Sequence, residues 1–133
     1  KIKLKEEEIY GLKKFKTYQD FGKKINKLKE NVTKNINELK KNNKNIVGFG
    51  APAKATTALN FFGISKQIDY VIEDNKLKHN KFIPGVLIPI KDKKALKEKN
   101  ALILVLAWNF FQEIKKNNSK LSNKFVNIKE LEN

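Results

Sequence analysis

The sequence contains no cysteine and no arginine, and it has a single histidine, His79. Without cysteine there is no disulfide, no thiolate metal ligand and no thiol nucleophile. One histidine cannot build a metal cluster, and none of the three serines lies in the turn motif of a serine nucleophile. His79 stands among lysines and is expected to face solvent. We therefore expect no metal site and no catalytic residue in this chain.

Long apolar runs are also missing. No stretch is long enough to cross a bilayer, and the first residues lack the pattern of a signal peptide. These absences predict a cytoplasmic protein without a membrane partner. Methionine is absent too, and the chain starts at Lys1, so we expect it to be a piece of a longer protein.

Positive charge is abundant, with a net charge of +15 carried entirely by lysine. A basic chain suggests nucleic-acid binding. Sequence-specific binding, however, favours arginine forks and clustered aromatic residues, whereas these lysines are spread along the whole chain. We interpret the charge as a solvated lysine surface that has no nucleic-acid partner and favours a small anionic ligand.

Two regions differ in their pattern. Residues 1–16 are mixed in character and are interpreted as a connector from a missing upstream domain, and residues 17–133 as one domain. Residues 17–41 are predicted to form a long amphipathic helix, because apolar residues recur every three or four positions. Those residues are Tyr18, Phe21, Ile25, Leu28, Val32, Ile36 and Leu39. The helix could pack on this domain or on a neighbour.

An α/β core is predicted over residues 45–128, where strand and helix patterns alternate. The clearest strand is Ala101–Ala107, a continuous apolar run typical of a parallel strand covered on both faces. The other predicted strands are Ile46–Phe49, Ile68–Ile72, Val86–Ile90 (placed at an edge by Pro89) and Phe125–Ile128. The predicted fold class is a small Rossmann-like open sheet, mainly parallel, with flanking helices.

A glycine turn follows the first predicted strand. The run Gly50-Ala51-Pro52-Ala53-Lys54 leads from a strand into a helix, and such a turn directs backbone N–H groups into one crevice. Pro52 suits the first turn of the helix because its missing N–H costs nothing there. Lys54 adds a mobile positive charge. These five residues are predicted to bind an anionic group, above all phosphate.

Two further segments are expected at the same edge, because the carboxyl ends of parallel strands meet there. The second strand leads to Asn75, and the Ala101–Ala107 strand leads to Trp108 and Asn109. The two amides are predicted to bind polar groups of a sugar or a base. Trp108 is predicted to stack on a ligand or to pack in the core.

A competing pattern runs through the glycine turn. Gly48, Gly50 and Ala53 match the looser dinucleotide pattern G-x-G-x-x-A, and Glu73 and Asp74 follow the second strand, about where a ribose partner belongs. Taken alone, this pattern suggests an NAD-binding oxidoreductase fragment. A structural turn without a ligand is the remaining interpretation.

Three ordered segments resemble one known family. They are Gly50-Ala51-Pro52-Ala53-Lys54 with Gly63-Ile64, then Ile68-Asp69-Tyr70-Val71 with Asp74-Asn75 and Pro84-Gly85, and then Leu106-Ala107-Trp108-Asn109-Phe110 with Glu113-Ile114. In this order they are similar to the C-terminal domain of SAM-dependent C-methyltransferases that act on nucleotide-linked deoxysugars. The resemblance covers residues 46–116.

The resemblance implies a longer enzyme in which a zinc-binding module and a SAM-binding methyltransferase domain precede this piece. SAM would be held by that upstream domain and no cofactor by this chain, so the fragment alone is expected to be inactive. The residues expected to hold the nucleotide-sugar are Gly50, Ala51, Pro52, Ala53, Lys54, Asn75, Trp108 and Asn109. An NAD-binding oxidoreductase fragment, and a structural or interaction domain without a ligand, stay open as alternatives.

Overall fold

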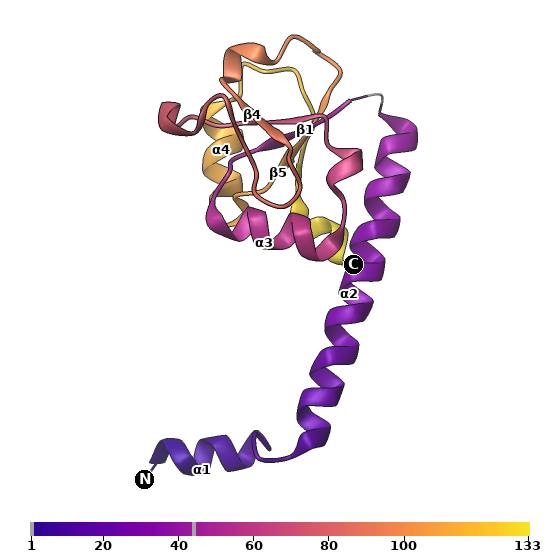
Figure 1. The fold of residues 1–133 in the computed structure, drawn as a ribbon, viewed down its shortest axis with the longest axis vertical. Helices are drawn as coiled ribbons and strands as arrows, with labels where there is room; N and C mark the ends of the chain where they lie inside the picture. Colours follow the sequence, from indigo (N-terminus) through magenta and orange to yellow (C-terminus); the bar gives the residue numbers. More distant parts are fainter. Residues whose placement is uncertain (1, 44) are drawn as a thin grey trace.

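A computed structural model describes residues 2–43 and 45–133 (Figure 1). Two helices come first, α1 (Ile2–Ile9) and the long α2 (Phe15–Asn42), and an α/β domain follows. The helix predicted over residues 17–41 is α2, slightly extended at both ends. Short 3-10 turns join the later elements: η1 (Ser65–Gln67), η2 (Lys76–Lys78), η3 (Lys93–Ala95), η4 (Trp108–Phe110) and η5 (Ile128–Glu132).

Six strands in the described part of the chain form one sheet, in the order β3-β4-β2-β1-β5-β6. The strands are β1 (Ile46–Phe49), β2 (Tyr70–Ile72), β3 (Lys81–Phe82), β4 (Pro89–Lys91), β5 (Leu102–Val105) and β6 (Phe125–Asn127). All neighbouring pairs are parallel except β3 with β4. The predicted α/β fold with a mainly parallel sheet is confirmed.

The predicted edge position of the Val86–Ile90 strand was wrong, because β4 lies between β2 and β3. Pro89 is tolerated there as the first residue of β4. The ladder with β2 begins one residue later, at the pair Val71–Ile90, so it needs no N–H from Pro89. Pro89 pairs instead with Phe82 of the two-residue β3.

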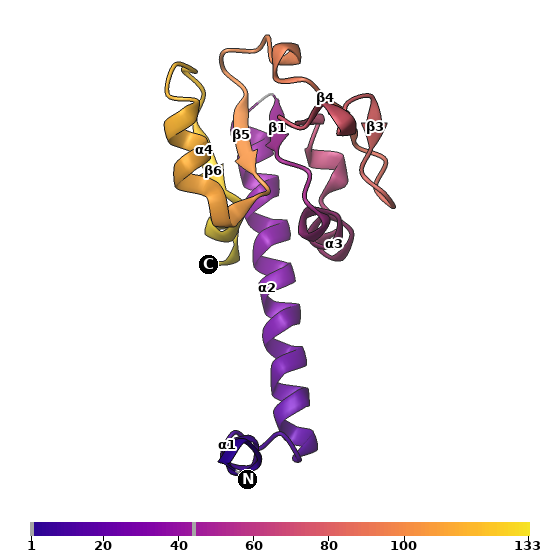
Figure 2. The same ribbon diagram turned by 90° about the vertical axis from the view of Figure 1, so that its left-hand side faces the viewer.

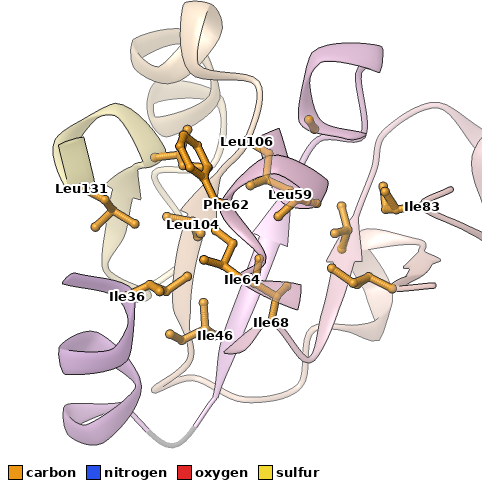
Figure 3. Close-up of a cluster of buried hydrophobic side chains, with 14 of the residues drawn as sticks. Ile36, Ile46, Leu59, Phe62, Ile64, Ile68, Ile83, Leu104, Leu106 and Leu131 are labelled. Carbon is orange, nitrogen blue, oxygen red and sulfur yellow. The ribbon is translucent and has the colours of Figure 1, made fainter. Parts of the chain in front are cut away.

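Helices cover both faces of the sheet (Figure 2). On one face lie α3 (Ala53–Phe62) and the second half of α2, and they bury a cluster that includes Ile36, Leu59 and Leu104 (Figure 3). On the other face lies α4 (Phe111–Asn117), which packs on a second cluster made mainly by β1, β2 and β5. Because both faces are covered, β1 and β5 are buried along their whole length.

The two halves of α2 have different surroundings. In the second half, Val32 and Ile36 are fully buried, and the Asn31 amide donates to the Glu132 carbonyl of η5 at 2.9 Å. The first half projects away from the α/β domain, with α1 at its far end (Figure 1). The apolar stripe of this helix is therefore used by the domain over only part of its length.

Gly48 offers a test of the packing between β1 and its neighbours. An added Cβ would lie 2.8 Å from Cγ2 of Val71 and 3.0 Å from Cδ1 of Leu106. We expect Gly48→Ala to lower the free energy of unfolding by about 1–3 kcal/mol, because the core would be overpacked. Urea denaturation measures the change. Gly22→Ala is the control, since a Cβ there meets no atom within 4 Å, and a Gly48→Ala midpoint at or above the parent value would contradict this account.

Candidate functional site

The carboxyl ends of β1, β2 and β5 meet at one edge of the sheet, as parallel pairing requires. A pocket of about 370 Å³ opens at this edge. Its walls are the segments that follow these three strands and one face of α4. Ligand sites of open α/β sheets form at the same place.

The glycine turn between β1 and α3 is tightly packed. Gly50 has a φ of +87°, and an added Cβ would lie 2.9 Å from the Cβ of Ala107. The Gly50 N–H donates to the Ile72 carbonyl at 2.8 Å, and the Ala51 N–H donates to Oε2 of Glu73 at 2.8 Å. Two of the N–H groups predicted to meet a phosphate are therefore already bonded within the chain.

Helix α3 begins directly after the turn, with Pro52 as its N-cap residue. Pro52 has no N–H to donate, and the N–H groups of Ala53 and Lys54 have no acceptor in the described part of the chain. Such N–H groups at the positive end of a helix favour an anion. The backbone donors that remain for an anion are thus those of Ala53 and Lys54.

Glu73 joins the glycine turn to the segment after β2. Its side chain is only 14% exposed, and its carboxylate accepts hydrogen bonds from the N–H groups of Ala51 and Asn75 and lies 3.7 Å from Nζ of Lys78. Burial by itself would raise the pKa of the Glu73 carboxyl, but the N–H groups of Asn75 and Ala51 and the Lys78 charge outweigh it and hold the pKa below its usual value. Glu73 is therefore ionised at neutral pH.

Lys78 and His79 hold the same segment in place. Nζ of Lys78 donates to the Ala51 carbonyl at 2.8 Å. Nε2 of His79 lies 2.7 Å from the Glu73 carbonyl, and Nδ1 lies 3.7 Å from the Asp92 carboxylate. A carbonyl oxygen only accepts, so Nε2 carries a proton. The side chain of His79 is 14% exposed, so the expectation that it faces solvent was wrong.

Lys54 and Trp108 lie together at the sheet edge. Nζ of Lys54 is 4.3 Å from the centroid of the Trp108 ring, within the range of a cation–π contact. Trp108 is half-buried and packs against the core on the face covered by α3. No carboxylate among the described residues lies within 4 Å of Nζ of Lys54. The Lys54 charge is therefore available to a ligand.

Neither of the two amides predicted for the site lines the pocket. Oδ1 of Asn75 accepts from the Leu77 N–H at 3.0 Å and caps η2. Asn109 is exposed in η4. Of the eight residues predicted to bind the ligand, Gly50 and Pro52 line the pocket.

Sequence reasoning missed most of the polar wall of the pocket. Glu113 and Asn117 line it from α4, Asn118 lines it from the C-cap position of that helix, and Lys78 lines it from η2. A partial signal was present, because Glu113 and Asn117 are four residues apart and share one face of a helix that follows the predicted site. Tertiary packing decides which helix forms the pocket wall opposite the segment after β2, so the sequence alone did not show that α4 does so.

Residues 2–43 and 45–133 contain neither a metal-ligand cluster nor a membrane-spanning helix. In those ranges, no group of three or more His, Asp or Glu side chains is placed to hold a metal ion. No helix there is both long enough and apolar enough to span a bilayer.

Comparison with known proteins identifies the family. A family model described as the C-methyltransferase C-terminal domain matches residues 1–128. The chain belongs to this family. A similar protein is the C-methyltransferase NovU of Streptomyces niveus, 31% identical over 113 residues, which cover 84% of this chain and 27% of NovU. The chain thus spans about a quarter of the length of that relative.

The match confirms the family resemblance of the three ordered segments. In this C-methyltransferase C-terminal domain, packing explains both glycines of the dinucleotide pattern. Gly48 lies inside β1, where Val71 and Leu106 leave no room for a Cβ, and Gly50 lies against Ala107. The pattern G-x-G-x-x-A therefore needs no dinucleotide to account for it.

The ionised Glu73 predicts a pH dependence of stability. Its pKa is lower in the folded state, so its stabilising effect is present above the unfolded-state pKa of about 4.3. The effect is lost as the pH falls through the folded-state pKa. We expect Glu73→Gln to lower the free energy of unfolding at pH 7 by about 1–3 kcal/mol, with the two proteins converging below pH 4.

Urea denaturation between pH 3 and pH 8 measures this convergence. Glu30→Gln is the matched control, because Glu30 is 70% exposed, 3.9 Å from Lys27, and such surface pairs contribute little. Curves for Glu73→Gln and the parent that stay parallel over the whole pH range would contradict the assignment.

Proposed function

We propose that this chain is the substrate-binding C-terminal domain of a SAM-dependent C-methyltransferase that acts on a nucleotide-linked deoxysugar. The observation that supports it best is the Lys54–Trp108 pair. It places a cation and an aromatic ring 4.3 Å apart at the carboxyl edge of β1 and β5, beside a pocket. An ammonium group binds the phosphates of a nucleoside diphosphate well, and an aromatic ring offers a stacking surface for its base.

Each predicted site residue has a place in this proposal. Lys54 meets the phosphates with its ammonium and, together with Ala53, with its backbone N–H. Trp108 supplies the stacking surface. Asn75 and Asn109, on the segments after β2 and β5, take polar groups of the sugar or base. Gly50, Ala51 and Pro52 shape the floor, and Ala51 becomes a donor to ligand only when Glu73 releases it.

The methyl group comes from SAM in this proposal, and the acceptor is the carbanion beside a ketone of the sugar. We place SAM outside this chain. The glycine turn after β1 is the segment that would approach SAM. Gly50 packs there against Ala107, and the Ala51 N–H is already bonded to the Glu73 carboxylate. The residues of this chain bind and orient the substrate, and the upstream domain carries the chemistry.

Nucleotide-sugar binding by the chain tests the proposal. We expect dTDP-glucose to bind, and Lys54→Ala to weaken binding about tenfold, a loss of about 1.4 kcal/mol. Isothermal titration calorimetry measures both. Lys66→Ala is the matched control, because Lys66 is an exposed lysine of η1, before β2 and thus near the opposite edge of the sheet. Micromolar NAD binding together with no dTDP-glucose binding would instead favour the oxidoreductase alternative.

We also propose that the projecting part of the chain contacts the upstream methyltransferase domain. Several apolar side chains of α1 and of the start of α2 are exposed in the part of the chain that the structure describes. They include Ile9, Phe15, Tyr18 and Phe21, which are 83%, 76%, 55% and 62% exposed. The relative NovU is almost four times as long as the segment that matches this chain, which supports the presence of a further domain in the full-length protein.

Limited trypsin digestion of the full-length protein tests this contact. Phe15→Ser/Phe21→Ser is expected to speed cleavage at the lysines of residues 13–29 several-fold, because the covering domain would separate from the helix. Leu77→Ser is the matched control, since Leu77 is 80% exposed in η2. Equal cleavage rates in the double variant and the parent protein would contradict the contact.

A further inference from the structure

The pocket has a wall on α4 that the proposed substrate residues leave unused. Glu113 and Asn117 lie one helical turn apart, and both are exposed and line the pocket. Neither side chain has a hydrogen-bond partner among the described residues. This wall therefore presents one acceptor group and one donor–acceptor group to whatever enters.

Asn118 adds a buried polar group to the same wall. It is only 6% exposed. Its Oδ1 accepts from Nζ of Lys93 at 2.9 Å, and its Nδ2 donates to the Ile114 carbonyl at 2.7 Å. The amide has two Nδ2 protons, and within the described residues only one of them has an acceptor.

The facing wall is acidic. Glu73 and Asp74 line the pocket from the segment after β2, so that with Glu113 three carboxylates surround the opening. Glu73 uses lone pairs on the N–H groups of Ala51 and Asn75, which leaves further lone pairs for a donor from a ligand. Three carboxylates together repel a phosphate, and their oxygens accept hydrogen bonds from hydroxyl groups.

The lysines near this pocket are already engaged. Lys78 is held by the Ala51 carbonyl and lies 3.7 Å from Glu73. Lys93 lies 3.2 Å from Asp74 and donates to Asn118. A phosphate entering the pocket would have to break these contacts, whereas a neutral ligand would not.

Apolar surface completes the enclosure. Phe49, which is 3% exposed, and Phe110, which is 57% exposed, both line the pocket. Ile114 of α4 also lines it. Apolar walls with a few polar groups are typical of sites for small organic ligands, and the C–H faces of a sugar ring pack on aromatic side chains.

We propose that this pocket binds a vicinal diol, with Glu113 and Asn117 on α4 and Glu73 opposite them as the residues that bond its hydroxyl groups. The diol belongs either to a hexose or to the ribose of a nucleotide. This inference rests on the proposed function, because it says which part of a nucleotide-sugar enters the pocket.

The anionic part of the same ligand lies at Lys54 and Trp108. These two side chains lie on the α3 side of the sheet edge, whereas α4 and its pocket wall lie on the other side. Gly50 and Ala107 line the pocket and lie close in the chain to Lys54 and Trp108, so the two subsites adjoin. The ligand thus crosses the edge of the sheet, with its phosphates on the cationic side and its diol on the acidic side.

NMR chemical shifts of the backbone amides in the ¹⁵N-labelled chain of 15.4 kDa test whether the phosphates and the diol bind at separate subsites. The two diol probes are methyl α-D-glucopyranoside and methyl β-D-ribofuranoside, and cyclohexanol is the control that lacks a vicinal diol. We expect at least one glycoside to shift Asp74, Glu113 and Asn117, with cyclohexanol shifting them far less. Inorganic pyrophosphate is expected to shift Ala53, Lys54 and the Trp108 indole N–H instead. The glycoside that binds more tightly identifies the source of the diol.

Substitutions in α4 distinguish a loss of ligand binding from a loss of folding stability. Glu113→Gln and Asn117→Ala are each expected to weaken glycoside binding about threefold or more and to leave pyrophosphate binding unchanged. Glu113→Gln replaces a charged acceptor with a weaker neutral one, and Asn117→Ala removes a hydrogen-bonding amide. Gln112→Ala is the matched control, since Gln112 is an exposed residue of the same helix that does not line the pocket. Unfolding midpoints of all three variants are expected to equal that of the parent.

The proposal is overturned if neither glycoside shifts the pocket residues, if both α4 variants bind the glycoside as the parent does, or if pyrophosphate shifts Glu113 and Asn117 more than Lys54. Failure of the proposed function gives a different result. In that case the glycoside still binds in the pocket, but dTDP-glucose binds no more tightly than methyl α-D-glucopyranoside, and Lys54→Ala changes neither.

Discussion

The hydrogen bond from the Ala51 N–H to the Glu73 carboxylate is the contact on which the site depends. It joins the turn after β1 to the segment after β2, and Lys78 completes the link by donating to the Ala51 carbonyl. A carboxylate this buried needs such donors, because a charge without them is expensive to remove from water. The same bond uses an N–H group that a glycine turn otherwise offers to phosphate. The glycine turn after β1 is therefore a structural part of the pocket wall as well as a candidate ligand-binding loop.

The order of the strands explains why the edge has two chemically different sides. After β1 the chain crosses one face of the sheet as α3, and after β5 it crosses the other face as α4. The cation that α3 carries, Lys54, lies against Trp108, while the free polar groups of α4, Glu113 and Asn117, face the pocket. A crevice at such a point in the strand order is where open α/β sheets bind ligands.

The apolar residues along one face of α2 lie in two different environments. The apolar spacing is the same from Tyr18 to Leu39, and it predicts the helix correctly. Only the second half finds the sheet, where Val32 and Ile36 are buried and Asn31 bonds to η5. The first half projects away from the α/β domain (Figure 1), and its aromatic side chains are exposed. Periodicity reports that a face is apolar, and tertiary structure decides what that face contacts.

The sequence by itself determined the fold class, because the signals are local: the continuous apolar run that became β5, the helical period of α2 and the glycine turn after β1. It also brought Lys54 and Trp108 to one edge, since parallel strands leave their carboxyl ends together. Only the tertiary structure decided that Glu73 occupies the Ala51 N–H and that α4 supplies the facing wall of the pocket. It also placed most of the His79 side chain out of solvent and put β4 between β2 and β3. Each of these contacts joins residues far apart in the chain, and no local pattern encodes which distant partner a hydrogen-bonding group will meet.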